Sequence, residues 1–206
     1  SFEIIITGKA THAAIPHLGC DPIVVAAQLI NSLQTIVSRN IDPSDCAVLS
    51  ITQIHAGNTW NAIPESVVLR GTFRSFNENV KTLIVDKMTQ LVNSICTGFD
   101  VSVKIEFNPE NEGYPVTFNT QAETAIALKA AQAVAGDNCV NQNPTPSMGA
   151  EDFSFMLQEK PGCYIWIGNG SSENSCLLHN PHYDFNDEIL PVGAAYWVKL
   201  VEIMLN

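Results

Sequence analysis

The sequence has little positive charge and no long apolar run, and both absences limit what the protein can bind. Ten Lys and Arg residues stand against 21 Asp and Glu residues, which gives a formal net charge of −11 at pH 7. Nucleic acid is therefore an unsuitable partner, because its phosphates require a basic surface. No apolar run approaches the roughly 20 residues that a helix needs to cross a bilayer, so we expect no membrane partner.

Cysteine pairs with metal-binding or redox spacing are also missing. The six cysteines are scattered, none forms a CxxC pair, and several lie in apolar segments. This pattern is typical of reduced core thiols in a cytoplasmic protein rather than of a disulfide framework. The sequence also begins at Ser1 without an initiator methionine. We therefore expect a piece of a longer protein, for which the absence of a targeting signal says little about location.

The first half contains a regular alternation of strand and helix patterns. Alternating or continuous apolar runs predict strands, and apolar residues at helical spacing, preceded by Asp21 as N-cap and Pro22 in the first turn, predict a helix. The order is βαββαβ, the ferredoxin-like split unit, with both helices on one face of an antiparallel sheet. The other face or an edge strand then needs a cover, for which a second subunit is the economical candidate. The expected strands are residues 2–7, 47–54, 66–73 and 101–107, and the expected helices are residues 22–39 and 77–95.

The composition shifts in the Pro- and Gly-containing segment 109–115, which we interpret as a domain boundary. Beyond it, residues 120–135, 151–158 and 191–205 are expected to be helices, and residues 163–168 a buried strand. So few strands provide little material for an independent core. The second half therefore has the character of the tail of a larger α/β domain, and the chain as a whole is predicted to be α+β.

His12 is the first candidate functional residue, in the loop between the first strand and the first helix. It lies between Thr11 and two alanines, so its small neighbours leave the ring room to project. An imidazole within reach of a carbonyl can stabilise the oxyanion that develops there. The other interpretation is a histidine that pins its own loop, and the residues alone leave both open.

Two further candidates accompany the central strands. Asn61, in the connecting segment 57–64, can both donate and accept hydrogen bonds, and Trp60 beside it offers an apolar wall. Asn61 either contacts a ligand or shapes the turn through its own backbone. Arg74 ends a Gly-Thr-Phe-Arg sequence on a strand, where its guanidinium either binds a substrate carboxylate or forms an ordinary surface salt bridge.

The second half supplies two more candidates. Gly149 precedes an acidic helix start, and a residue without a side chain lets a backbone N–H approach a ligand closely. His179 follows a Gly-, Ser- and Asn-containing loop and is a candidate metal ligand, with Asp184 as its outer partner. One histidine is a weak metal signal, because a zinc site requires three or four protein ligands and no HxxxH, HExxH or CxxC spacing supplies the others.

Five segments together resemble those of a known family: KATHAAIPH (residues 9–17), HAGNTWNAIP (55–64), GTFR (71–74), MGAEDF (148–153) and LHNPHYDFND (178–187). The order in which they occur is that of the M20 metallopeptidases, and they are most similar to the amidohydrolase branch. That branch includes hippurate hydrolases, N-acyl-amino-acid deacylases, auxin-conjugate hydrolases and N-acetyl-diaminopimelate deacetylases.

The resemblance implies an enzyme built from two domains. Residues 1–110 would be a βαββαβ lid and dimerisation domain, through which a homodimer forms. Residues 111–206 would be the C-terminal portion of a zinc-peptidase-like α/β catalytic domain, into which the lid is inserted. The small-molecule substrate would be an N-acyl amino acid.

The resemblance also implies roles for the five candidates. His12 resembles the lid histidine that stabilises the oxyanion in the partner subunit's active site. Asn61 and Arg74 resemble the lid residues that hold the carbonyl and the carboxylate of the substrate. Gly149 resembles a backbone contact to the bound acyl amino acid, and His179 matches the last ligand of a dinuclear metal site.

The same resemblance shows what this sequence lacks. The remaining metal ligands, in a Cys-Gly-His-Asp motif and a paired-glutamate motif, and the general-base glutamate belong to an N-terminal segment outside it. We therefore expect the full-length parent to hydrolyse N-acyl amino acids with two divalent ions (zinc, or manganese, cobalt or nickel), and this chain alone to be inactive and to hold no metal stably. The alternative is a non-enzymatic ferredoxin-like module for dimerisation or small-molecule regulation.

Overall fold

The computed structural model describes residues 1–109, 113–170, 176 and 178–205 and divides the chain into two compact units. The first unit is Ser1–Val116 and the second is Thr117–Asn206. Each unit is described by itself below. Among the described residues, no helix is both long enough and apolar enough to cross a membrane.

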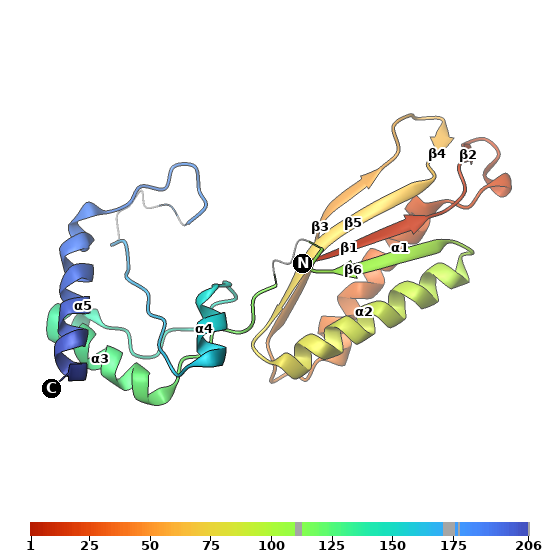
Figure 1. The fold of residues 1–206 in the computed structure, drawn as a ribbon. Helices are drawn as coiled ribbons and strands as arrows, with labels where there is room; N and C mark the ends of the chain where they lie inside the picture. The colour runs from red at the N-terminus through yellow and green to blue at the C-terminus, as the bar shows by residue number, and fades with distance from the viewer. Residues whose placement is uncertain (110–112, 171–175, 177, 206) are drawn as a thin grey trace. The chain divides into compact units, whose positions relative to one another are not determined.

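The first unit has the predicted βαββαβ order, with two short strands added (Figure 1). The predicted helix at 22–39 continues beyond its regular part as a π-helical turn, Ile36–Asn40. Asp21 caps this helix as predicted, since its side chain accepts a hydrogen bond from the Ile23 N–H at 2.9 Å. The elements are β1 (Phe2–Thr7), β2 (Thr11–His12), α1 (Pro22–Thr35), β3 (Ala47–Ala56), β4 (Ala62–Ile63), β5 (Ser66–Ser75), α2 (Glu78–Gly98) and β6 (Ser102–Phe107).

Four of the strands form one antiparallel sheet in the order β3-β5-β1-β6. Phe2 on β1 faces Gly71 on β5 and Phe107 on β6. A Cβ at Gly71 would lie 2.5 Å from the Phe2 ring and 2.2 Å from the Ser50 carbonyl oxygen, so only glycine lets that ring pack against the sheet. The Phe2 ring thereby lies in the buried core.

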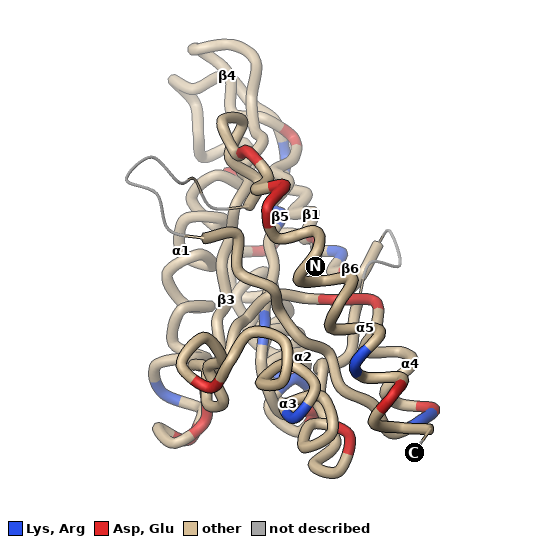
Figure 2. The backbone as a smooth tube through the Cα atoms, turned by 90° about the vertical axis from the view of Figure 1, so that its left-hand side faces the viewer, with Lys and Arg blue, Asp and Glu red and all other residues tan. Residues whose placement is uncertain are grey.

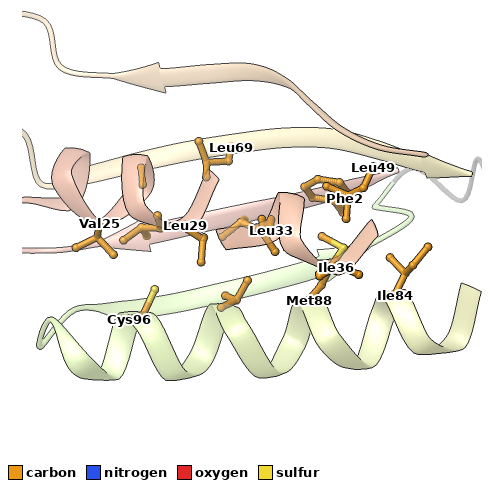
Figure 3. Close-up of a cluster of buried hydrophobic side chains, with 14 of the residues drawn as sticks. Phe2, Val25, Leu29, Leu33, Ile36, Leu49, Leu69, Ile84, Met88 and Cys96 are labelled. Atoms are coloured by element: carbon orange, nitrogen blue, oxygen red, sulfur yellow. The ribbon is translucent and has the colours of Figure 1, made fainter. Parts of the chain in front are cut away.

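The core of the first unit lies between this sheet and the two helices, which cover the same face (Figures 1 and 3). Phe2, Leu29, Leu69 and Met88 come from four different elements, and each is at most 1% exposed. Full burial of such a side chain contributes about 1.5–3 kcal/mol. The core therefore fixes the sheet as a rigid base for the loops at its ends.

A β-bulge interrupts β3 between Ile51 and Gln53. The extra residue, Thr52, shifts the alternation of the strand, so that Ile51 and Ile54 both share the face covered by the helices. His55 consequently falls on the open face of the sheet, where its ring is 3.2 Å from the Gln53 side-chain oxygen.

The second unit is helical where it has regular structure. Its helices are α3 (Gln121–Ala135), α4 (Phe153–Glu159) and α5 (Leu190–Leu205), close to the predicted ranges. Ala127, Ala130 and Tyr196 are buried where α3 packs against α5. One prediction fails here: no buried strand forms at 163–168.

The reason for that failure is the lack of a neighbouring strand in the described part of this unit. The segment is extended, and the ladder-like bonds that it makes with described residues come from a side chain: Asn119 donates to the Tyr164 carbonyl at 2.9 Å and accepts from the Tyr164 N–H at 2.8 Å. Trp166 is 61% exposed and Ile167 46%, so the segment is not buried either. An apolar run predicts burial only where a partner surface is present.

Candidate functional site

Two of the five candidate residues meet at one end of the sheet. There β2 and β4 pair as a two-residue antiparallel ribbon, with His12 opposite Ala62. The Ala13 N–H donates to the Asn61 carbonyl at 2.9 Å, which joins the His12 loop to the Asn61 turn. We call this ribbon with its flanking turns, residues 10–20 and 56–64, the arm. The arm contains no Lys, Arg, Asp or Glu, and its tube around β4 is uncharged in Figure 2.

The base of the arm is closed by backbone bonds at short range. Lys9 and Cys20 exchange two backbone hydrogen bonds, of 3.0 and 3.1 Å, and the Gly8 N–H donates to the Glu65 carbonyl at 2.8 Å. A Cβ at Gly8 would lie 2.2 Å from the Cys20 carbonyl oxygen, so glycine is required for this approach. The position of His12 is therefore set by the sheet rather than by a free loop.

The His12 ring has a defined tautomer. Its Nδ1 accepts a hydrogen bond from the Ala14 N–H at 3.1 Å. In the neutral ring one nitrogen accepts and the other donates, so the proton lies on Nε2. Nε2 has no hydrogen-bond partner among the residues that the structure describes. The exposed ring is thus prepared to donate one hydrogen bond to a ligand.

Asn61 is oriented by a neighbour two residues earlier. The Thr59 hydroxyl donates to the Asn61 side-chain oxygen at 3.0 Å. This bond leaves the amide NH₂ group of Asn61 as a donor, without a partner in the described part of the chain. His12 and Asn61 therefore both present N–H donors on one arm, as an oxyanion would require.

Arg74 lies far from the arm. It is near the end of β5, whereas the arm begins where Val67 of β5 pairs with Ala56 of β3. Seven residues of antiparallel strand, at about 3.4 Å each, separate Val67 from Arg74 by about 24 Å. One copy of the chain therefore does not bring Arg74 to His12 and Asn61.

The guanidinium of Arg74 forms no ion pair with any described residue, in contrast to a second arginine on the same face. Arg70 donates to the Glu3 carboxylate at 2.7 Å. Among the described residues, Arg74 donates to the Phe73 carbonyl at 3.4 Å and to no carboxylate. The surface salt bridge that was one interpretation of Arg74 is thus absent from the described part of the chain.

Gly149 lies in the segment before α4, where its N–H donates to the Ser147 hydroxyl at 3.1 Å. A ligand would therefore compete with Ser147 for this N–H. Close by in the sequence, Glu151 affects the pKa of Tyr164. Burial raises the pKa of Tyr164, and the charge of Glu151 and a hydrogen bond to it raise that pKa further. The predicted helix begins two residues later than expected, with Asp152 at the N-cap, and the Asp152 side chain makes no capping bond there.

His179 has a left-handed backbone, with φ of 68°. Such a conformation is uncommon outside glycine, and it is found often at positions held for a function. The side chain of Asn169 holds the segment after His179: it donates to the Asp184 carbonyl at 2.8 Å and accepts from the Asn186 N–H at 2.7 Å. No hydrogen bond between His179 and the Asp184 side chain is present in the structure as described.

The donor set in this chain does not suit a metal ion by itself. Within residues 1–109, 113–170, 176 and 178–205, no three His, Cys, Asp or Glu side chains gather where they could hold one. A protein zinc site uses three or four such ligands. His179 alone falls short of that number.

Residues 6–203 match the Peptidase family M20/M25/M40. The chain belongs to this family. Among its relatives, the N-acetylcysteine deacetylase of Bacillus subtilis is 34% identical over 210 residues, which cover 100% of this chain and 52% of that protein. The hippurate hydrolase of Campylobacter jejuni is 34% identical over 200 residues, 97% of this chain and 51% of that protein.

A solved M20 structure supports the same assignment. It is a dinuclear metal-binding peptidase from Bacillus subtilis, which matches with a TM-score of 0.70 and 28% identity over 99% of this chain and 49% of that one. The predicted family and the α+β fold class are therefore confirmed. This M20 chain spans about half the length of the relatives that it matches.

Sequence reasoning missed the groups that orient the two arm residues. The Ala14 N–H fixes the His12 tautomer, and the Thr59 hydroxyl orients Asn61. A backbone N–H leaves no signal in a sequence. Thr59, two residues before Asn61, is a weak signal in the sequence, because short polar side chains often form hydrogen bonds at that spacing in turns.

Proposed function

We propose that the whole protein, meaning the natural polypeptide that contains this sequence, hydrolyses the amide bond of N-acyl amino acids in a metal-dependent reaction. The observation that carries the proposal is the arm, on which His12 and Asn61 present two N–H donors while Arg74 lies about 24 Å away at the other end of β5. The activities named for the M20 relatives agree with this substrate class. We assign residues 1–110 to the lid and 111–206 to the catalytic domain.

The residues of this chain would bind and polarise the substrate. The Nε2–H of His12 and the amide of Asn61 donate to the carbonyl oxygen, whose negative charge grows in the transition state. The guanidinium of Arg74 takes the substrate carboxylate through two parallel hydrogen bonds. Gly149 supplies a backbone contact to the bound acyl amino acid.

The metal would be a pair of divalent ions, zinc or manganese, cobalt or nickel. His179 would be one ligand, and the others would come from outside this sequence, because the donor set described here is too small. Bound metal supplies Lewis-acid polarisation and an activated water. We place the protein in the cytoplasm, in keeping with scattered cysteines of which none forms a CxxC pair.

The separation of Arg74 from the arm leads to a dimer. In an N-acyl amino acid only a nitrogen and one carbon separate the carbonyl from the carboxylate group. A span of about 24 Å is too long for His12 and Arg74 of one copy to hold one substrate molecule. In a two-fold dimer, Arg74 would serve one active site while His12 and Asn61 serve the other. Edge strands β3 and β6, each paired on one side only among the described residues, leave edges through which the lids would associate.

Subunit mixing tests this arrangement in the whole protein. His12→Ala and Arg74→Ala each inactivate a homodimer, but a mixed dimer keeps one site in which both residues are intact. After random exchange of equal amounts, about one quarter of wild-type activity should return. His12→Ala mixed with Asn61→Ala is the matched control, and it should stay inactive because both residues come from the same arm.

Failure of the first mixture to regain activity, with exchange verified by mass spectrometry, would contradict the shared site. Absence of turnover of any N-acyl amino acid by the metal-loaded whole protein would contradict the function itself. We also expect the 206-residue chain alone to be inactive. Measurable deacylase activity in that purified chain would disprove this last statement.

Exposed apolar surface in the second unit supports the view that another segment completes it. Six apolar side chains on α5 are at least half exposed, and a cavity of about 620 Å³ lies among α3, α5 and the extended segment near Tyr164. None of the five candidate site residues lines that cavity. A helix that is apolar on most sides is normally buried in the complete protein. The six are Leu190, Trp197, Val198, Val201, Met204 and Leu205.

A further inference from the structure

Trp60 is the most conspicuous unused residue on the arm. Its side chain is fully exposed, at 103% of the reference value, whereas Trp166 and Trp197 are 61% and 62% exposed. Tryptophan carries a large apolar surface and is mostly buried in folded proteins. A fully exposed indole therefore suggests a contact that forms only when something else is bound.

The backbone that carries Trp60 is held on both sides. Thr59 donates to the Asn61 side chain at 3.0 Å, and the Asn61 carbonyl accepts the Ala13 N–H at 2.9 Å. Consecutive Cα atoms are about 3.8 Å apart, so the indole is attached next to the Asn61 donor. Trp60 therefore lies in whichever site His12 and Asn61 occupy.

The arm can be desolvated at low cost. It has no Lys, Arg, Asp or Glu, and Leu18 and Ile15 are exposed on it as well, at 55% and 40%. Charged residues are depleted where protein surfaces become fully buried, because removing them from water is expensive. The surface around Trp60 is thus suited to enter a dry site.

We propose that Trp60 is a specificity-determining residue that forms a wall of the acyl pocket in the second subunit's active site. This inference rests on the proposed function. His12 and Asn61 would contact the carbonyl oxygen, and the carboxylate end of the substrate lies toward Arg74. The group adjoining the arm is therefore the acyl substituent. An indole face favours a flat aromatic or large apolar acyl group over acetyl.

The test compares two substrates that differ only in the acyl group, N-benzoylglycine and N-acetylglycine, with the metal-loaded whole protein. Trp60→Ala should lower kcat/KM for N-benzoylglycine about tenfold to hundredfold, and for N-acetylglycine less than about threefold. Trp60→Phe should keep most of the preference, because it retains an aromatic face. Leu18→Ala, another exposed apolar residue of the arm, is the matched control and should leave the ratio of the two values unchanged.

An equal loss of kcat/KM for both substrates would overturn the inference and assign Trp60 to the contact between subunits. No loss for either substrate would overturn it as well. Thermal unfolding of each variant shows whether the fold is intact, which is expected for a side chain that contacts solvent. If the wild-type protein hydrolyses neither these substrates nor any other N-acyl amino acid, the proposed function fails as well. A wild-type protein that is active without the selective loss removes only the role of Trp60.

Discussion

Gly8 offers the sharpest test of whether the sheet sets the position of the arm. Alanine at this position would place its Cβ 2.2 Å from the Cys20 carbonyl oxygen and 3.0 Å from the Pro22 ring, whereas ordinary contacts begin at 3.4 Å. The backbone at Cys20 must therefore move by about 1.2 Å, and the Lys9–Cys20 hydrogen bonds at the base of the arm move with it. A misplacement of about 1 Å can cost about a hundredfold in rate.

We accordingly expect Gly8→Ala to lower kcat of the whole protein by about a hundredfold, while unfolding free energy falls by only about 1–3 kcal/mol. Initial rates on an N-acyl amino acid and thermal unfolding followed by circular dichroism measure the two effects. Gly98→Ala is the control, because nothing lies within 4 Å of a Cβ at this last residue of α2. A Gly8→Ala enzyme with wild-type kcat would refute the idea that the base of the arm sets the His12 pose.

Three other predictions use the 206-residue chain itself. Nitrogen-15 spectra at high pH should show His12 in a single tautomer protonated at Nε2, because the Ala14 N–H occupies Nδ1, and a mixed population would contradict this. Met88→Ala should lower the unfolding free energy of the first unit by about 2–5 kcal/mol in denaturant, since Met88 is fully buried, whereas the volume-conserving Met88→Leu should cost less than about 1.5 kcal/mol. A hydrogen bond from Thr120 lowers the pKa of Glu123, so its stabilising contribution is present above the ordinary pKa and is lost as pH falls through the lowered one. Thermal melts of Glu123→Gln should therefore depend less on pH below about pH 4 than those of wild type, and identical slopes would argue against the bond.

The fold of the first unit was predictable because its signals are local. Apolar periodicity located all six major elements, and Asp21 with Pro22 marked the start of α1 to the residue. The ribbon of β2 and β4 was missed because two-residue strands have no periodicity. Their pairing depends on closure of the loop at Gly8, which is a tertiary contact.

The candidate site was predictable only in part, for a related reason. Residue types drew attention to His12, Asn61 and Arg74, but they do not show which of these residues meet in the fold. The structure joins the first two across the arm and leaves the third about 24 Å away, at the far end of β5. The prediction of a strand at 163–168 was wrong because its apolar pattern requires a neighbouring strand, which the described residues do not contain.

The bulge in β3 constrains how the length of this hairpin can vary among homologues. Removing Thr52 would leave Ile51 paired with Gly71 and Gln53 paired with Arg70, so it would restore simple alternation without changing the face of the residues between the bulge and the arm. A single-residue insertion beyond the bulge would instead exchange the faces of the residues between it and the arm. Length differences between the bulge and Asn61 should therefore occur in pairs of residues, and an odd difference should be accompanied by a second bulge nearby.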